Sequence, residues 1–241
     1  MGYLPTGSES GPALLVADEG TVHREGLDPG RELSFALGDR HCAGVRLGDQ
    51  HDPCDAPGAP YCETHTVPWS VANNADSEEE HAVYLAAFAP DVFKVGVTRT
   101  WRLETRLREQ GADRAAHVYT VPDGRVARDV EADVAADVPD RVRVPTKVRG
   151  LHRDVDESAW HDLLADFDVL ERFDFDYGLD LDAQPVPETL ASGSVLGAKG
   201  RVLVLERAGT AYAVNMRDLV GYEVSEGGDD RDAQASLGAF G

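Results

Sequence analysis

The chain has 241 residues, 42% of them hydrophobic, and 44 acidic against 23 basic side chains give it a formal charge of −21. This apolar content excludes a wholly disordered chain, and the apolar runs are too short for a transmembrane helix, so no membrane partner is expected. We expect a core domain of about 100–150 residues with one or two small modules. The first residues show no secretory signal, so the expected location is the cytoplasm.

The charge is uneven along the chain. Only three of the 23 basic residues are lysines, Lys94, Lys147 and Lys199. A dispersed acidic, lysine-poor surface is typical of a halophilic protein, whose salt-rich surroundings screen carboxylate repulsion; the alternative is an acidic function such as nucleic-acid mimicry.

Two segments are more basic than the rest of the chain. Residues 91–114 carry six basic and four acidic side chains, and residues 141–153 carry five basic and no acidic ones. These two basic segments are the candidate contacts for a polyanion.

The order of segments predicts an α+β protein. Short apolar runs between Gly, Pro and Asp turns indicate strands near both ends, and the middle of the chain has the pattern of a packed core. The expected segments are a β-rich entry segment at 1–40, a Cys/His zinc-binding segment at 41–80, an α/β core at 81–140, a basic linker and acidic helix at 141–187, a small β module at 188–224 and a disordered tail at 225–241.

The segment 41–80 has too few aliphatic residues to fold by burial alone, but it contains all three cysteines of the chain. Cys42, Cys54, Cys62 and His65 are separated by eleven, seven and two residues. Three thiolates and one imidazole are the ligand set of a closed structural zinc site, and an odd cysteine count argues against a disulfide framework. His41 and His51 are spare ligands. The alternatives are three buried, hydrophobe-like cysteines or a nucleophilic thiol.

From residue 81 onward the predicted elements follow closely. Apolar runs at 83–88 and 93–97, joined by a turn, predict a hairpin, and a helix at 102–110 is ended by Gly111. A strand at 118–121 precedes a helix on which Val126, Val130 and Val134 recur every fourth residue. After a linker with two prolines we expect a helix from Asp156 to about residue 167, loop and edge strand at 173–187, and a hairpin at 202–214.

Several polar residues lie on this apolar core. Tyr84 and Lys94 belong to the two hairpin strands, and three arginines, Arg99, Arg102 and Arg106, fall at or on the following helix, where their spacing lets them share a face. The next helix carries Glu131. A phenol, an arginine and a carboxylate suit phosphate-ester hydrolysis, in which the carboxylate holds a divalent metal such as Mg²⁺ or Mn²⁺.

Nucleic acid is the expected partner of the basic segments, with Arg99, Arg102 and Arg149 as the candidate contacts. Trp101 is either a stacking platform for a base or, as is commoner, a core residue. Taken singly, each site residue also has an ordinary interpretation: Tyr84 as a half-buried strand residue, Arg106 as a partner of Glu109 or Glu104, and Glu131 as one more surface acid.

The order Ala82-Val83-Tyr84, Lys94-Val95-Gly96-Val97-Thr98-Arg99, Arg106 and Ala127-Arg128-Asp129-Val130-Glu131 resembles the core of the GIY-YIG nuclease superfamily. The resemblance implies a hairpin-plus-helices core, with Tyr84 as the tyrosine of the first signature triplet, Arg106 as the helical arginine and Glu131 as the metal ligand. Lys94 stands where the second triplet has tyrosine, and Ala82 stands where the first has glycine.

A closer resemblance covers most of residues 41–224 and is to an uncharacterised prokaryotic family. It rests on the Cys/His cluster, the Lys-Val-Gly-Val-Thr-Arg turn, the helix end Gln110-Gly111-Ala112, Asp156-Glu157-Ser158-Ala159-Trp160 and the hairpin Gly197-Ala198-Lys199-Gly200. Further cysteines of some members, near residues 69–77, are absent here. Three functions stay open: a metal-dependent nuclease, a non-catalytic nucleic-acid-binding module, and a protein-interaction module.

Overall fold

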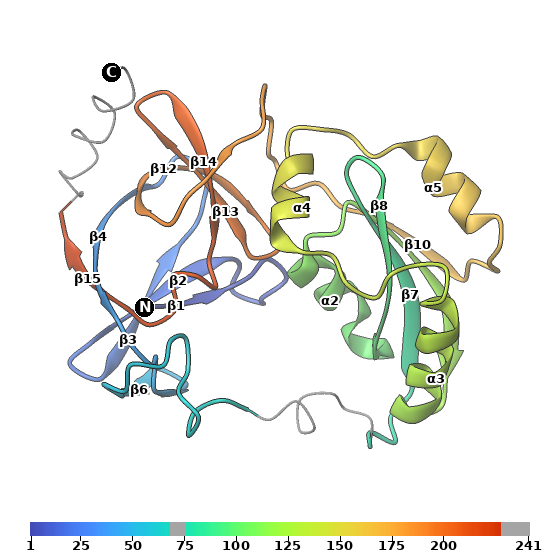
Figure 1. The fold of residues 1–241 in the computed structure, drawn as a ribbon, viewed down its shortest axis with the longest axis horizontal. Coiled ribbons are helices and arrows are strands. Elements are labelled where there is room, and N and C mark those ends of the chain that lie inside the picture. Colours follow the sequence, from blue (N-terminus) through green and yellow to red (C-terminus); the bar gives the residue numbers. More distant parts are fainter. Residues whose placement is uncertain (68–75, 228–241) are drawn as a thin grey trace.

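The computed structural model describes residues 1–67 and 76–227, which form a β unit and an α/β unit side by side (Figure 1). The β unit contains two sheets. The five-stranded sheet runs β1 (Gly2–Leu4), β2 (Ala13–Asp18), β3 (Thr21–Gly26), β6 (Gln50–Asp52), β5 (Val45–Leu47). The six-stranded sheet runs β11 (Val186–Pro187), β14 (Thr210–Asn215), β13 (Val202–Arg207), β12 (Ala191–Lys199), β4 (Glu32–Arg40), β15 (Tyr222–Glu226). The disordered tail is expected from residue 225, but residues 225 and 226 belong to β15; from residue 228 on, the tail lies outside the described residues.

The two β segments that the sequence separates, 1–40 and 188–224, share one sheet and one core. β4 pairs antiparallel with both β12 and β15, so the entry segment is inserted between C-terminal strands. One hydrophobic cluster includes Leu14 and Leu33 from the first segment together with Leu203 and Val214 from the second. The two segments therefore form one packing unit, since neither sheet buries its apolar face alone.

The α/β unit is built on a four-stranded antiparallel sheet. Its strands run β10 (Glu171–Asp174), β9 (Arg114–Val121), β7 (His81–Phe88), β8 (Val92–Arg99). Every residue of the central strand β7 is buried, because helices cover both faces of the sheet. This explains why β7 reads as a continuous apolar run rather than an alternating one. The predicted hairpin and its direction of pairing are confirmed.

The helices are η1 (Thr100–Arg102), α2 (Leu103–Gln110), α3 (Gly124–Val134), α4 (Val144–Gly150) and α5 (Glu157–Leu164). Leu103 and Leu107 place α2 on one face of the α/β sheet, and α3 and α5 pack on the other. α2 ends at Gly111, which adopts φ 69°, as predicted. The helix α4 lies in a segment that the sequence analysis treats as linker; Pro145 occupies its first turn, where proline is tolerated. No helix among the described residues has the length and apolarity of a membrane span.

The two units meet at the C-terminal end of α2. There Thr6, after β1, donates its hydroxyl to the backbone carbonyl of Arg108 at 2.6 Å, and its backbone N–H donates to the carbonyl of Gly200 at 3.0 Å. Gly111 and Gly200 are in backbone contact, since a Cβ on Gly111 would lie 2.9 Å from the nitrogen of Gly200. Two segments that carry the closer family resemblance, the α2 end and the β12–β13 turn, are therefore neighbours.

Candidate functional site

The structure brings the four predicted metal ligands together. The ligand atoms of Cys42, Cys54, Cys62 and His65 all lie within 4.8 Å of one another. The Nδ1 atom of His65 is 3.2 Å from the Cys42 sulfur and 3.4 Å from the Cys62 sulfur. Zinc bonds of ordinary length place tetrahedral ligand atoms roughly 3.5–3.8 Å apart. The described cluster is therefore a group that could hold a metal ion.

The two spare histidines are not part of the cluster. His41 Nδ1 lies 3.0 Å from the carbonyl oxygens of Cys42 and Cys54, and His51 Nε2 lies 2.8 Å from that of Ala43. Both rings therefore hold the backbone that carries the ligands. Burial raises the pKa of Cys42, but hydrogen bonds from the backbone of Cys62 and Gly44 and from His65 outweigh it and lower the pKa to about 6. The environment thus favours the thiolate of Cys42, whereas the neighbouring Cys42 and Cys62 contribute to a raised pKa of Cys54.

Tyr84 and Lys94 lie on neighbouring strands and face α2. Tyr84 is 1% exposed, and the Lys94 Nζ atom lies 6.0 Å from the centre of its ring. Burial raises the pKa of Tyr84, although the charge of Arg106 and a hydrogen bond from Gln110 oppose this. Burial also lowers the pKa of Lys94 to about 8, with a further contribution from Arg106. Near neutral pH the phenol is therefore protonated, and a fraction of Lys94 is neutral.

Gly96 fixes the position of the Tyr84 ring. It pairs with Tyr84 across the hairpin, and a Cβ at this position would lie 2.6 Å from the Tyr84 hydroxyl oxygen and 2.7 Å from Cζ. No side chain fits there unless the buried ring moves.

A Gly96→Ala variant is expected to lose about 1–3 kcal/mol of unfolding free energy, because the new methyl group overpacks the core against a ring that cannot swing into solvent. Denaturant unfolding measures this loss. Gly38→Ala is the control, since its Cβ would have no neighbour closer than 3.4 Å and should change stability little. Equal stability of both variants would contradict the tight contact.

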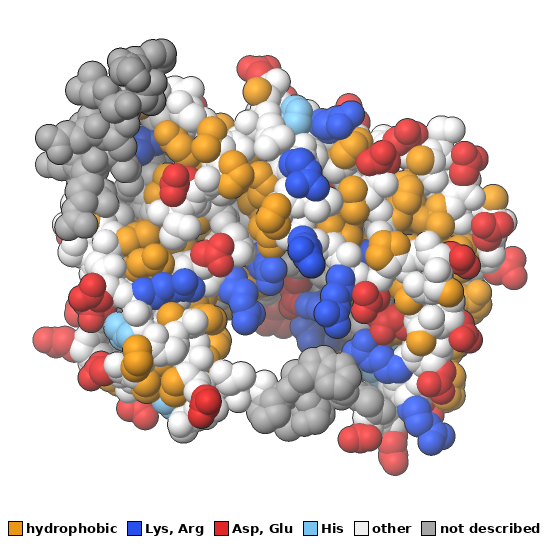
Figure 2. Space-filling view, in the orientation of Figure 1, with side chains coloured by type: hydrophobic (Ala, Val, Ile, Leu, Met, Phe, Trp, Pro, Cys, Tyr) orange, Lys and Arg blue, Asp and Glu red, His pale blue; other side chains and the backbone are white. Residues whose placement is uncertain are grey.

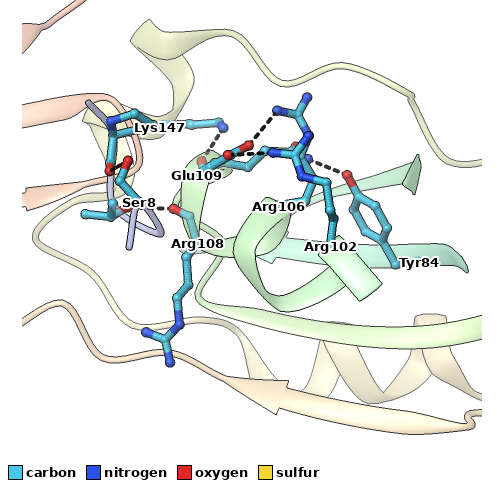
Figure 3. A network of polar contacts seen from close by, with 10 residues as sticks. Ser8, Tyr84, Arg102, Arg106, Arg108, Glu109 and Lys147 are labelled. Atoms are coloured by element: carbon cyan, nitrogen blue, oxygen red, sulfur yellow. Dashed lines mark hydrogen bonds and ion pairs between the residues drawn. The ribbon is translucent and has the colours of Figure 1, made fainter. Parts of the chain in front are cut away.

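Arg106 lies on α2 in an ion-pair group. Glu109 contacts Arg102 at 2.9 Å and Arg106 at 3.2 Å, so one carboxylate holds two guanidinium groups (Figure 3). The ordinary interpretation of Arg106 as a partner of Glu109 is thus correct for this structure. The same guanidinium also influences the pKa of both Tyr84 and Lys94, so it lies within electrostatic range of the hairpin residues.

Glu131 approaches the same group from α3, which packs against β8 and β7. Its side chain is 13% exposed and forms an ion pair with Arg128 at 2.6 Å. Its charge raises the pKa of Tyr84 and of Lys94. Glu131 therefore lies within electrostatic range of both hairpin residues.

The three residues predicted to contact nucleic acid do not form one group. Arg99 pairs with Glu79 at the end of β8, whereas Arg149 lies exposed on α4 and donates to Thr146 at 3.1 Å. Arg102 joins the Glu109 pair described above. Trp101 is 69% exposed, so its placement in a core is wrong, and the guanidinium of Arg102 lies 5.9 Å from the centre of its ring.

Three further residues, which have no predicted role in the site, lie beside these. Gln110 donates a hydrogen bond to the Tyr84 hydroxyl. Lys147 donates to the carbonyl of Gln110 at 2.6 Å and lies 4.1 Å from the centre of the Phe88 ring, and it approaches α2 from α4 (Figure 3). Lys199 pairs with Asp113. The available signal was the rarity of lysine in the chain, which made each lysine an exception worth placing.

Fold and site together define a mixed α+β protein with a Cys/His cluster that could hold a metal ion in one unit and a group of basic side chains around the β7–β8 hairpin and α2 in the other. A family model described as a protein of unknown function (DUF2797) matches residues 69–224, more than half of the chain. The chain belongs to this family, which agrees with the expected uncharacterised family; the matched range begins after the Cys/His cluster. No curated protein and no solved structure matches the chain.

Proposed function

We propose that the protein is a zinc-stabilised phosphodiesterase or nuclease that acts on nucleic acid with a divalent metal, Mg²⁺ or Mn²⁺. The observation that carries this proposal is the grouping of Tyr84, Lys94, Arg106 and Glu131, in which the charges of the last two act on both of the first two. Cations that steady phosphate oxygens, beside a carboxylate able to hold a metal, form a set suited to phosphodiester hydrolysis.

The order of elements supports a GIY-YIG-like core. An antiparallel hairpin, β7–β8, comes first; the helix with Arg106 follows; then come strand β9 and the helix with Glu131. The superfamily that the sequence resembles has its site residues on the same succession of elements. The register adds support, because Tyr84 lies directly opposite Gly96, the glycine of the second triplet.

The surroundings of each residue indicate its role in the proposed hydrolysis. The buried, protonated Tyr84 does not suit proton abstraction, so we assign it a positioning role through Gln110. Lys94, with its pKa near 8, is the better base for an attacking water. Arg106 steadies the charge that develops on the phosphate oxygens.

The divalent metal belongs at Glu131. This carboxylate is mostly buried and held by Arg128, and one fixed carboxylate together with substrate phosphate oxygens is a donor set that Mg²⁺ accepts. When bound, the metal would polarise the phosphate and lower the pKa of water.

Zinc is the metal that we assign to the Cys/His cluster. Three thiolates and one imidazole leave no open position for substrate, so the ion is part of the scaffold. The arrangement supports this role, because the cluster joins the end of β4 to the loops on both sides of the β5–β6 hairpin.

A Glu131→Gln variant tests the enzymatic role. We expect metal-dependent cleavage of DNA or RNA to slow by about 100-fold, because the amide loses the charge that attracts the cation, while binding of the uncut strand is retained. Asp129→Asn, an exposed substitution on the same helix, is the matched control and should cleave normally. A purified wild-type protein that cuts no DNA or RNA with Mg²⁺ or Mn²⁺, at low and high salt, would refute the enzyme.

A non-catalytic nucleic-acid-binding module is the second candidate. It is favoured by the full burial of Tyr84 and by the pairing of Arg106 with Glu109, both of which suit a structural role. Its signature is binding that weakens with salt and needs no divalent metal. A protein-interaction role is the remaining alternative, and it predicts no affinity for either nucleic acid.

A further inference from the structure

A basic cavity lies where the β unit meets the α/β unit. It has a volume of about 490 Å³, and its lining includes seven basic and two acidic side chains, a formal +5 within a chain of −21. Basic side chains gather along this boundary, and acidic ones dominate the right-hand periphery (Figure 2). The lining includes all three lysines of the chain, Lys94, Lys147 and Lys199, although arginines outnumber lysines 20 to 3. The lysines are therefore concentrated in this cavity, although the chain as a whole is poor in lysine.

The protein neutralises only part of the positive charge of this cavity. Glu109 is engaged by two arginines of the α2 region, Asp140 lies 3.5 Å from Arg141, and Asp113, which is outside the lining, pairs with Lys199. Within residues 1–67 and 76–227, no carboxylate forms an ion pair with Lys94, Lys147 or Arg201. Like charges brought together without partners destabilise the folded chain, and a bound anion would remove that cost.

Among the three lysines of the cavity, Lys147 has the environment that is least favourable for a charged side chain. It is only partly exposed on α4, and it faces Phe88 and Gln110. Burial lowers its pKa to about 7, and Lys94, Arg201, Arg106 and Lys199 lower it further in that order; the cations come from β8, α2 and the β12–β13 turn. A fixed anion among these groups would restore the charge of Lys147, so the cavity is arranged for a ligand of opposite sign.

The size and remaining walls of the cavity restrict the ligand. A volume of about 490 Å³ is in the range of small-molecule pockets, which is enough to hold one nucleotide but not a segment of double helix. Tyr3 and Val144 are also part of the lining and offer aromatic and apolar surface against which a base or sugar can pack. Cations for a phosphate and apolar surface for a base or sugar match the two parts of a nucleotide.

We infer that this cavity binds the phosphate of one nucleotide unit, so that the site takes a single strand, or a strand end, in preference to a duplex. Lys147 and Arg201 hold that phosphate, while Lys94 and Arg106 extend the cavity to the site proposed above. The inference rests on the proposed function where those two residues are shared, but the binding itself needs neither catalysis nor divalent metal.

Fluorescence anisotropy without added divalent metal tests the inference. The probes are a labelled single-stranded oligonucleotide and its blunt duplex, with a mononucleotide and inorganic phosphate as competitors. We expect the single strand to bind at least tenfold more tightly than the duplex. Lys147→Gln and Arg201→Gln should each weaken it roughly tenfold, the loss expected for one charged hydrogen bond, and should make the salt dependence shallower by about 0.7 per lost contact.

Arg172→Gln is the control, because Arg172 is exposed on β10, at the opposite edge of the sheet from β8, and should bind like wild type. Thermal melts establish that each variant is folded. If Lys147→Gln does not fold, the binding of Arg201→Gln tests the inference. Competition by the mononucleotide supports a free nucleotide as ligand, and competition only by the strand supports a polymer. Duplex binding as tight as single-strand binding, or affinity unchanged in both cavity variants, overturns the inference. If Glu131→Gln loses cleavage while Lys147→Gln binds normally, the proposed function holds and the cavity inference fails. If Lys147→Gln loses binding while the wild-type protein cuts no nucleic acid, the cavity inference holds and the proposed enzyme fails.

Discussion

A Cys54→Ser variant is expected to contain almost no zinc and to lose the structure of residues 41–67, whereas the wild-type chain should carry about one zinc ion. The reason is that this segment has no core of its own. The described residues form four hydrophobic clusters, and none of these clusters includes a residue from 41–67. Its order therefore depends on the cluster, and structural zinc contributes roughly 10–16 kcal/mol to the folding of comparable small peptides.

The loss should stay local. The β-unit core has its members outside residues 41–67, so the rest of the chain keeps its own burial. Metal analysis of the purified protein and limited proteolysis within 41–67 are the measurements. His51→Gln is the matched control, since the His51 ring contacts the Ala43 carbonyl instead of the metal site and a glutamine amide can donate to the same carbonyl, so zinc should stay in place. A folded wild-type protein without zinc, or Cys54→Ser with its full content, would show that the cluster is not a zinc site.

The elements between residues 81 and 134 could be predicted because their signals are local. The apolar run of β7, the four-residue spacing of valines on α3 and the stop at Gly111 each identify an element without knowledge of its neighbours. The helix α4 was missed for a local reason as well, since Pro145 and the basic residues around it resemble a linker, although proline is acceptable in a first turn.

What the sequence could not supply is long-range pairing. β4 joins strands that follow it by more than 150 residues, and no pattern within residues 1–40 specifies that partner. The burial of Tyr84 has the same origin: a tyrosine in a strand is expected to be half-buried, but the helix α2 and Phe175, from beyond β10, close over that face of the sheet.

The members of the candidate catalytic site and their roles stay predictions. As a hypothesis, the grouping of Tyr84, Arg106 and Glu131 followed from the order of elements. The cavity did not, because Lys94, Lys147 and Lys199 come from β8, α4 and β12 and meet only when the two units pack. Their scarcity in the sequence was visible, but its meaning depends on their common location.

Replacing Lys94 with Arg is expected to lower the cleavage rate by about 10²–10⁴-fold, the contribution typical of a general base, while the charge that attracts phosphate is kept. The protonated form of Lys94 cannot accept a proton, so the wild-type turnover rate at saturating substrate should rise with pH and level off above about 8, the pKa to which burial and Arg106 lower this group. A guanidinium stays protonated throughout this range, so Lys94→Arg should show no such rise.

The readout separates catalysis from binding. Lys147, with its pKa near 7, loses charge over a neighbouring range and is expected to weaken substrate affinity as the pH rises, which affects KM and not the saturated rate. Lys147→Arg, which stays charged, should remove that change in KM and leave the pH profile of the saturated rate intact. A Lys94→Arg variant that keeps both the wild-type rate and its profile would assign the base to another group. In that case Lys94 would act only as one of the cations that hold the phosphate.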